Sequence, residues 1–233
     1  MLSRESSSSA ICCRRLWPGR SSGGMRSIAV LGAAIISLKS MNNAVIFRTS
    51  LKDRRFDLAF HLYQTKLELI EGDATQPPAD GLILPANDHL WMGTGPGRKI
   101  KETGGEEIEK AAVREGPVDM GGVVVTPAGS LPFRHILHTA VMSQDLHLKS
   151  DVLGRGLTNA LERAAQMELA EVNFVLPLET GDRPLRPEIL ADLVGTLFVA
   201  LEEMPQIRTL RLVADNAATR QVLHDAFLHR LYA

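Results

Sequence analysis

The sequence predicts an α/β fold in which helices cover both faces of a mostly parallel sheet. From about Leu62 onward, apolar runs of strand length alternate with stretches of about 10–15 residues in which apolar side chains recur at helical spacing. One strand-length run, 81–85 (GLILP), is apolar throughout, which is typical of a strand buried on both faces. A chain of 233 residues has room for one such domain with an appendage.

The predicted elements are bounded by turn and capping residues. Gly72-Asp73 ends the first strand, and Pro187 stands near the first position of a helix, where its missing N–H costs little. In chain order, we expect strands at 66–71, 81–85, 123–126, 135–139, 172–176 and 209–213, and helices at 106–115, 153–167, 187–201 and 217–231. Ligands of open α/β sheets bind at the carboxyl ends of the strands, so the loops that follow the strands are the candidate site.

The amino-terminal part differs from the rest of the chain in its amino-acid composition. Residues 1–40 begin with a stretch rich in Arg, Ser and Gly, and such a composition predicts a disordered extension. Two alternatives are a targeting peptide, which would direct the protein to an organelle, and a start codon placed too early, with Met25 or Met41 as the true start. We expect residues 41–62 to be a linker or an edge element, and residues 63–231 to form the domain.

Charge and cysteine content exclude several classes of protein. Residues 1–56 carry a net charge of +8 and the remainder carries −9, so the folded part repels a polyanion such as duplex nucleic acid. The two cysteines, Cys12 and Cys13, are adjacent, which excludes a disulfide framework and a thiolate zinc site within one chain. No apolar run approaches the roughly 20 residues that span a bilayer. We therefore expect a monomeric cytoplasmic protein with no metal, no cofactor and no membrane contact.

Four loops after predicted strands carry residues suited to ligand binding: 72–75 (GDAT), 85–88 (PAND), 93–97 (GTGPG) and 177–182 (PLETGD). Asp73 either accepts a hydrogen bond from the exocyclic amine of a base or bonds its own turn. Asn87 suits a ribose hydroxyl or a positioned water, and the alternative is a local Asn turn. The glycines favour a backbone nest for an anion, and the alternative is a flexible loop before a helix.

In this order, the loops resemble the macro domain family, which binds ADP-ribose and includes Appr-1″-p processing proteins. The matching pieces are LELIEGDAT (67–75), ADGLILPAND (79–88), GTGPG (93–97), GG (104–105), the VVVTPAG–LP–RHILHTA segment (123–140) and PLETGD (177–182). Together they span about residues 63–231. The resemblance implies a three-layer α/β/α fold with a mixed, mostly parallel central sheet.

The resemblance also implies a set of site residues. Asp73, followed by Ala74, corresponds to the carboxylate that holds the adenine amine, and Asn87 corresponds to the asparagine beside the distal ribose. The remaining implied ligand-binding residues are Gly93, Thr94, Gly95 and Gly97 in a first phosphate loop, Thr180, Gly181 and Asp182 in a second one, and Thr139 and Ala140 at the end of a strand that borders the cleft.

Two departures from the family pattern bear on the activity. Hydrolytic members carry an aspartate near the end of the glycine loop, where this chain has Gly97. The second phosphate loop carries Glu179 and Asp182, and their carboxylates repel a pyrophosphate. We therefore expect binding of ADP-ribose, or of an ADP-ribosyl group on a protein or small molecule. One alternative is a slow ADP-ribosyl-ester hydrolase in which Asn87 orients water and the ligand's pyrophosphate is the base. The other is a degenerate fold that serves as a structural or interaction module.

Histidines and one tryptophan complete the candidates. His89 is the histidine nearest the expected cleft and is a candidate acid–base group, although lone histidines are more often structural. His135 and His138 lie three apart, on opposite faces of a predicted strand, so they do not form a metal pair. Trp91 either stacks on a ligand or covers the edge of the core.

Overall fold

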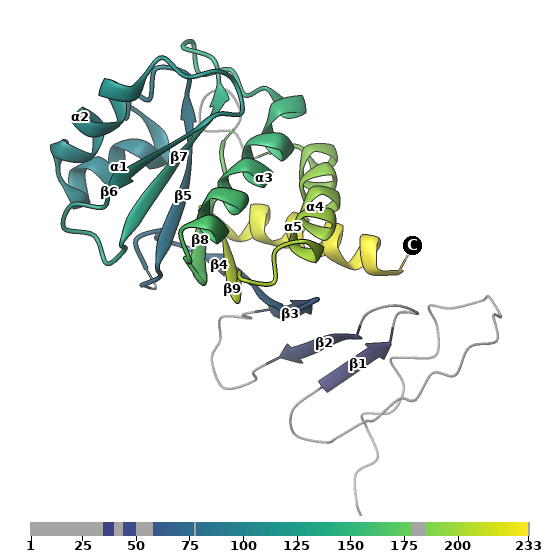
Figure 1. Ribbon diagram of the computed structural model, residues 1–233. Coiled ribbons are helices and arrows are strands. Elements are labelled where there is room, and N and C mark those ends of the chain that lie inside the picture. Colours follow the sequence, from purple (N-terminus) through teal and green to yellow (C-terminus); the bar gives the residue numbers. More distant parts are fainter. Residues whose placement is uncertain (1–34, 40–43, 50–57, 77, 179–184, 233) are drawn as a thin grey trace, which may run out of the picture.

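A computed structural model describes residues 35–39, 44–49, 58–76, 78–178 and 185–232, which form nine strands and five helices (Figure 1). The strands are β1 (Ile35–Lys39), β2 (Ala44–Thr49), β3 (Leu58–Leu62), β4 (Thr65–Glu71), β5 (Gly81–Asn87), β6 (Val123–Pro127), β7 (His135–Met142), β8 (Glu171–Val175) and β9 (Thr209–Ala214). The helices are α1 (Gly95–Gly104), α2 (Glu106–Glu115), α3 (Ser150–Gln166), α4 (Pro187–Glu202) and α5 (Ala217–Tyr232).

All nine strands belong to one mixed sheet in the order β1-β2-β3-β4-β9-β8-β5-β7-β6. The five strands from β4 to β7 in this order run parallel, so their carboxyl ends meet at one edge of the sheet. Antiparallel strands flank them: β6 pairs with β7 on one side, and β3, β2 and β1 extend the sheet on the other. The predicted mixed sheet with a parallel centre is confirmed.

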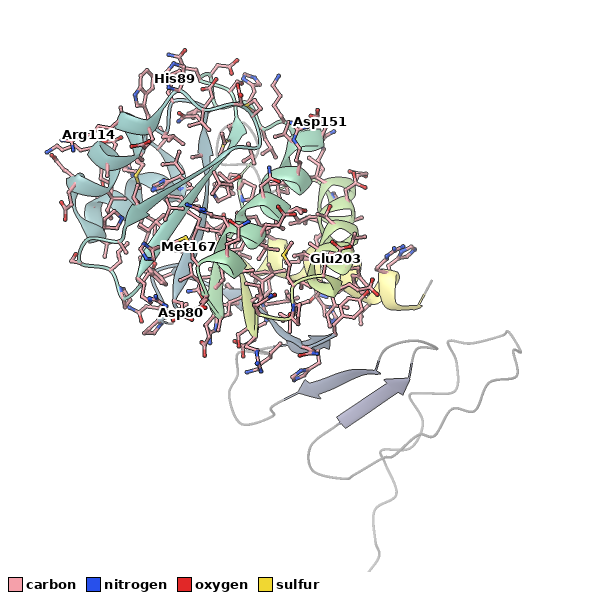
Figure 2. The ribbon with its side chains drawn as sticks, in the orientation of Figure 1. Asp80, His89, Arg114, Asp151, Met167 and Glu203 are labelled. Carbon is pink, nitrogen blue, oxygen red and sulfur yellow. The ribbon has the colours of Figure 1, made fainter. Side chains whose placement is uncertain are left out.

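Helices cover both faces of the sheet, which confirms the three-layer α/β/α prediction (Figure 1). Helices α3, α4 and α5 pack on one face, over a core that includes Leu69, Leu137 and Phe174. Helices α1 and α2 pack on the other face, over a smaller core that includes Leu84 and Ile136. Figure 2 shows that Asp80, before β5, and His89, after it, lie at opposite ends of the sheet, and the candidate site is at the His89 end.

Helix α3 approaches β7 closely because of a glycine. A Cβ built on Gly156 would lie 2.7 Å from both Thr139 Oγ1 and Val141 Cγ1, closer than van der Waals contact permits. Any larger residue at this position would push α3 away from the strand. The glycine therefore costs helix propensity but permits the close packing of α3 on the sheet.

The structure differs from the sequence prediction at the glycine-rich segment. Residues 93–97 were expected to form a loop, but α1 already begins at Gly95 and Pro96 lies in its first turn, where proline is tolerated. At the amino terminus, β1 lies within the segment predicted as an extension, and β2 and β3 lie within residues 41–62, which were predicted as a linker or an edge element. The rest of residues 1–40 lies outside the described residues. Within the described chain, no helix is long and apolar enough to cross a membrane.

Candidate functional site

A cleft runs along the carboxyl ends of the parallel strands and consists of two adjoining cavities. The Asp73 cavity, of about 400 Å³, lies over the ends of β4, β8 and β9. The Asn87 cavity, of about 230 Å³, lies over the ends of β5 and β7. Gly95, Pro96 and Leu178 line both cavities, so the first turn of α1 forms the boundary between them.

The Asp73 cavity combines two carboxylates, Asp73 and Asp215, and one lysine with apolar walls. Asp73 Oδ1 accepts hydrogen bonds from the backbone N–H of Thr75 at 2.9 Å and from its hydroxyl at 2.8 Å. Asp73 Oδ2 lies 3.1 Å from Lys99 Nζ, on the second turn of α1. Partial burial acts to raise the pKa of Asp73, but the hydrogen bonds from Thr75 and the Lys99 ammonium outweigh it, so the net pKa lies below the ordinary value. Asp73 is therefore a carboxylate at neutral pH.

The first turn of α1 brings backbone N–H groups to the middle of the cleft. Gly95 has a φ of +53°, a conformation that favours glycine, and a Cβ built there or on Gly93 would meet nothing within 4 Å. Thr94 is the N-cap residue in an extended conformation. The amino-terminal end of a helix carries a partial positive charge and unpaired N–H donors, which together favour an anion.

The loop between β5 and α1 is held in place by a partly buried carboxylate. Glu109, on α2, accepts a hydrogen bond from the backbone N–H of Met92 at 2.6 Å and pairs with Lys101 at 2.9 Å. Partial burial acts to raise the pKa of Glu109, but the bonds from Lys101 and Met92 prevail and lower it. The ionised Glu109 thus ties this loop to α1 and α2, while Trp91 remains half exposed beside the cleft.

Asn87 has the geometry of a local turn. Its Oδ1 accepts the backbone N–H groups of His89 at 3.0 Å and Trp91 at 3.2 Å, and its Nδ2 donates to the carbonyl of Trp91 at 3.0 Å. These bonds use both lone pairs of the amide oxygen and one of its two N–H groups. Asn87 lines the cavity, and its second N–H remains to donate a hydrogen bond to a ligand oxygen. Its amide cannot accept a proton from water in this arrangement.

The end of β7 and the loop that follows it reach the cleft through residues that the sequence interpretation did not name. Met142 and Leu146 line the Asn87 cavity, whereas Thr139 and Ala140 line neither cavity and are fully buried. The Thr139 hydroxyl points toward α3, as the contact with a Gly156 Cβ shows. Strand β7 ends at Met142, beyond its predicted end at 139, and its pairing with β5 shifts by one residue between Ala86 and Asn87.

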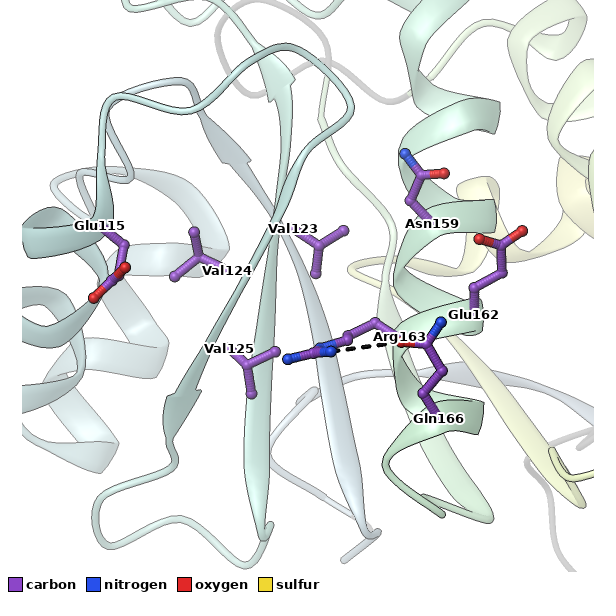
Figure 3. Close-up of a pocket in the computed structure, with 8 residues that line it drawn as sticks. All are labelled: Glu115, Val123, Val124, Val125, Asn159, Glu162, Arg163 and Gln166. Atoms are coloured by element: carbon purple, nitrogen blue, oxygen red, sulfur yellow. Dashed lines mark hydrogen bonds between the residues drawn. The ribbon is translucent and has the colours of Figure 1, made fainter.

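Another hollow, larger than either cavity, lies away from this cleft. It is a groove of about 490 Å³ between α3 and the edge strand β6, and Figure 3 shows Val123, Val124 and Val125 along it. Arg163 and Gln166 of α3, which form part of its wall, are joined by a hydrogen bond of 3.5 Å. The groove follows the lateral edge of the sheet, where strand ends and helix N-termini do not converge, so it lacks the features that favour a ligand in an α/β fold.

Comparison with known proteins places this chain in a family. The model of the macro domain matches residues 83–193. An uncharacterised protein of Sulfolobus acidocaldarius is 33% identical over 71% of this chain and 93% of its own length, and one of Aquifex aeolicus is 32% identical over 54% of this chain and 76% of its own. The chain belongs to the macro domain family.

Solved macrodomain structures share its fold. A macrodomain of Oceanobacillus iheyensis with ADPR matches with a TM-score of 0.66 over 75% of this chain and 98% of that one, at 22% identity. A Trypanosoma brucei macrodomain in complex with ADP-ribose matches with a TM-score of 0.61 over 68% of each chain, at 20% identity. At these identities, the likeness concerns the arrangement of the elements.

Within this macro domain, six of the nine predicted site residues that the structure describes line the cleft. Asp73 and Ala74 line one cavity, Asn87, Thr94 and Gly97 line the other, and Gly95 lines both. Gly93 precedes this group in the same loop, and Thr180, Gly181 and Asp182 lie outside the described residues. Pro177 and Leu178, which lead into that segment, do line the cleft.

The sequence interpretation missed Lys99, Val213 and Asp215, which line the Asp73 cavity. In a helix that begins at Gly95, Lys99 lies one turn later on the same face, so the spacing could have placed it beside the cleft. The helix itself was not predicted, so that spacing carried no information. Asp215 directly follows β9, and the rule that strand ends carry the site would have found it.

The histidines do not line either cavity. His89 Nδ1 lies 2.9 Å from Asp88 Oδ1, and its ring packs at 5.2 Å from the Trp91 ring, outside the cleft. His138 is fully buried, with Nε2 2.9 Å from Thr126 Oγ1 and no hydrogen-bond partner for Nδ1. Burial lowers the pKa of His138 to about 4, so it is a neutral core residue at physiological pH. In the described part of the chain, no three His, Cys, Asp or Glu side chains gather as metal ligands would.

Proposed function

We propose that this macro domain binds ADP-ribose, or an ADP-ribosyl group attached to another molecule, in the cleft at the strand ends. The observation that carries the proposal is the position of the α1 amino terminus between the two cavities. A ligand with a central diphosphate would place its anionic part at this helix end, with one arm in each cavity. Other macrodomains of this fold have been solved with ADP-ribose.

Each cavity suits one arm of such a ligand. The Asp73 cavity offers a carboxylate for an exocyclic amine and an apolar lining that includes Ile100 and Val213, which suits a base. The Asn87 cavity is smaller and offers the second N–H of the Asn87 amide, which suits a ribose hydroxyl. We therefore assign the adenine to the Asp73 cavity and the distal ribose to the Asn87 cavity.

Calorimetric titration tests the proposal. ADP-ribose should bind, and AMP and ADP should each bind more weakly because they fill only part of the cleft. Ribose-5-phosphate should be the weakest of the four, since it lacks the base. A titration in which ADP-ribose gives no binding heat, under conditions where the protein is folded, would reject the proposal.

The geometry favours binding over hydrolysis of an ADP-ribosyl ester. A hydrolase needs a positioned water and a group that accepts its proton, within about 3 Å of each other. Gly97, in the first turn of α1, has no side chain to do so, and both lone pairs of Asn87 Oδ1 are taken by backbone N–H groups. Among the described residues that line the Asn87 cavity there is no Asp, Glu or His, so we take the ligand's own phosphate as the base. We therefore expect slow turnover of mono-ADP-ribosylated aspartate or glutamate. Rapid removal of ADP-ribose that Asn87→Ala abolishes would make hydrolysis the primary function.

A further inference from the structure

The carboxylate proposed to hold the base has a cationic neighbour. Lys99 Nζ lies 3.1 Å from Asp73 Oδ2, while both hydrogen bonds from Thr75 go to Oδ1. The oxygen left for a ligand is therefore the one beside Lys99. A base amine that binds Oδ2 must come close to the ammonium group as well.

Lys99 is also the one cationic side chain among the described residues that line the two cavities. An ammonium group has three N–H donors, and Asp73 Oδ2 occupies one of them. More than half of the Lys99 side chain is exposed to solvent, so water satisfies the others in the free protein. The site thus presents a hydrogen-bond acceptor and a hydrogen-bond donor side by side.

We propose that Asp73 and Lys99 read the edge of the base together. Asp73 Oδ2 accepts a hydrogen bond from an exocyclic amine, and Lys99 Nζ donates one to the ring nitrogen next to that amine. Adenine carries such a pair in its N6 amine and its N1 atom. This inference rests on the proposed binding of ADP-ribose and assigns Lys99 as a specificity-determining residue within it.

The energetic reason is the loss of water from the ion pair when a base enters. The exposed pair contributes little by itself, because water competes for both charges. A base that contacts Ile100 and Val213 in this cavity removes part of that water. Each charge then needs a replacement partner, since an unpaired polar group without water is costly. A base with an amine beside an acceptor nitrogen supplies both partners, and a base without the acceptor leaves the ammonium unsatisfied.

The test measures the binding of two ligands to two proteins by calorimetric titration, so that the Lys99 ammonium and the adenine N1 atom are each removed separately and together. The proteins are the full chain and its Lys99→Met variant, which keeps an unbranched side chain but removes the ammonium. The ligands are ADP-ribose and its 1-deaza analogue, in which a C–H group replaces the adenine N1. The wild-type protein should bind the analogue about tenfold more weakly than ADP-ribose, near the low end for a hydrogen bond to a charged group.

Lys99→Met should bind the two ligands equally, within about twofold, because the N1 atom has then lost its donor. The matched control is Arg98→Met, which removes a neighbouring charge of α1 that pairs with Glu102 and lines neither cavity. This control should keep the tenfold preference for ADP-ribose over the analogue.

Three outcomes would overturn the role of Lys99 while leaving ADP-ribose binding intact. A tenfold preference that persists in Lys99→Met would show that another group contacts N1. Tighter binding of ADP-ribose to Lys99→Met would show that the lysine competes for Asp73. Equal weakening of ADP-ribose, the analogue and ribose-5-phosphate by the substitution would assign the ammonium to a phosphate. Absence of ADP-ribose binding to the wild-type protein would instead reject the proposed function, and the base-reading role with it.

Discussion

The buried histidine of β7 predicts a loss of stability in weak acid. His138 has a pKa of about 4 in the folded protein, lowered by burial from an ordinary value of 6.5. Between pH 6.5 and pH 4, His138 is protonated in the unfolded chain but stays neutral in the folded protein. The contribution of neutral His138 is therefore fully present above pH 6.5 and is lost as the pH falls from 6.5 toward 4.

The magnitude follows from the difference between the two pKa values. One pKa unit corresponds to about 1.4 kcal/mol, so a difference of about 2.5 units corresponds to about 3 kcal/mol of unfolding free energy at pH 4. Such a loss is a large fraction of the stability of an ordinary domain. Protonation of carboxylates with lowered pKa values, such as Glu68, also destabilises the folded protein in acid. A variant without His138 is therefore needed to separate the contribution of the histidine.

The assay is urea denaturation at several pH values between 7 and 4, on the wild-type protein and on a Thr126→Val/His138→Leu double variant. The double variant removes the titrating ring together with the hydroxyl that bonds it, so no polar group is left unpaired. The stability of the wild-type protein relative to the variant should fall by about 3 kcal/mol between pH 7 and pH 4. His135→Gln, at the first residue of β7, measures what removal of a partly exposed histidine does by itself.

Parallel stability curves for the wild-type protein and the double variant, separated only by a constant offset, would refute the reasoning. They would mean that His138 takes up a proton in the folded state about as readily as in the unfolded chain. That behaviour requires solvent or an acidic partner at its ring, whereas the His138 side chain is buried and its Nε2 bonds the Thr126 hydroxyl.

Four further predictions follow from the cleft, the packing and the amino terminus. Asp73→Ala should weaken ADP-ribose by about 1–3 kcal/mol and ribose-5-phosphate hardly at all, in calorimetric titration; equal losses would contradict its contact with the base. Gly97→Asp should fold, because a Cβ there meets Met92 no closer than 3.5 Å, and it should raise ester hydrolysis by supplying the absent acid; an unchanged rate would contradict that role. Gly156→Ala should lower the unfolding free energy by about 1–3 kcal/mol through overpacking, whereas Gly195→Ala, with open space around it, should raise it by about 0.5–1 kcal/mol; the same sign for both would contradict the packing account. A chain that starts at Met41 should keep the Tm of the full chain, because among the described strands β1 pairs only with β2, and the described buried core begins at Leu62; a large drop would show that the removed residues pack on the domain.

Most of the architecture could be predicted from the sequence because its elements have strong local signals. The apolar run 81–85 predicted a buried strand, and β5 (Gly81–Asn87) is buried along its whole length. The prediction for α2 matched the observed helix, since its acidic first turn and apolar spacing agree. Helix α1 was missed because three glycines and a proline at 93–97 suggest a loop, whereas its stability comes from packing Ile100 into the core. Tertiary packing overrode weak local propensity there.

The site was predicted less completely than the fold. The rule that ligands bind at strand ends identified the loops of Asp73 and Asn87, which do border the cleft. The same rule could not give the direction of a side chain. Thr139 belongs to a strand that borders the cleft, but the alternation of side chains along β7 points its hydroxyl toward α3. Lys99 was missed because α1 was not predicted, so the sequence did not indicate that Lys99 contacts Asp73, which lies 26 positions earlier in the chain.

A crystal structure of the full chain with ADP-ribose tests the central claim most directly. We predict that the diphosphate lies at the first turn of α1, against the backbone of Gly95 and Gly97, with the adenine in the Asp73 cavity and the distal ribose beside Asn87. The amine of the adenine should lie within hydrogen-bonding distance of Asp73 Oδ2. A ligand bound in the reverse orientation, or in the groove between β6 and α3, would contradict the account.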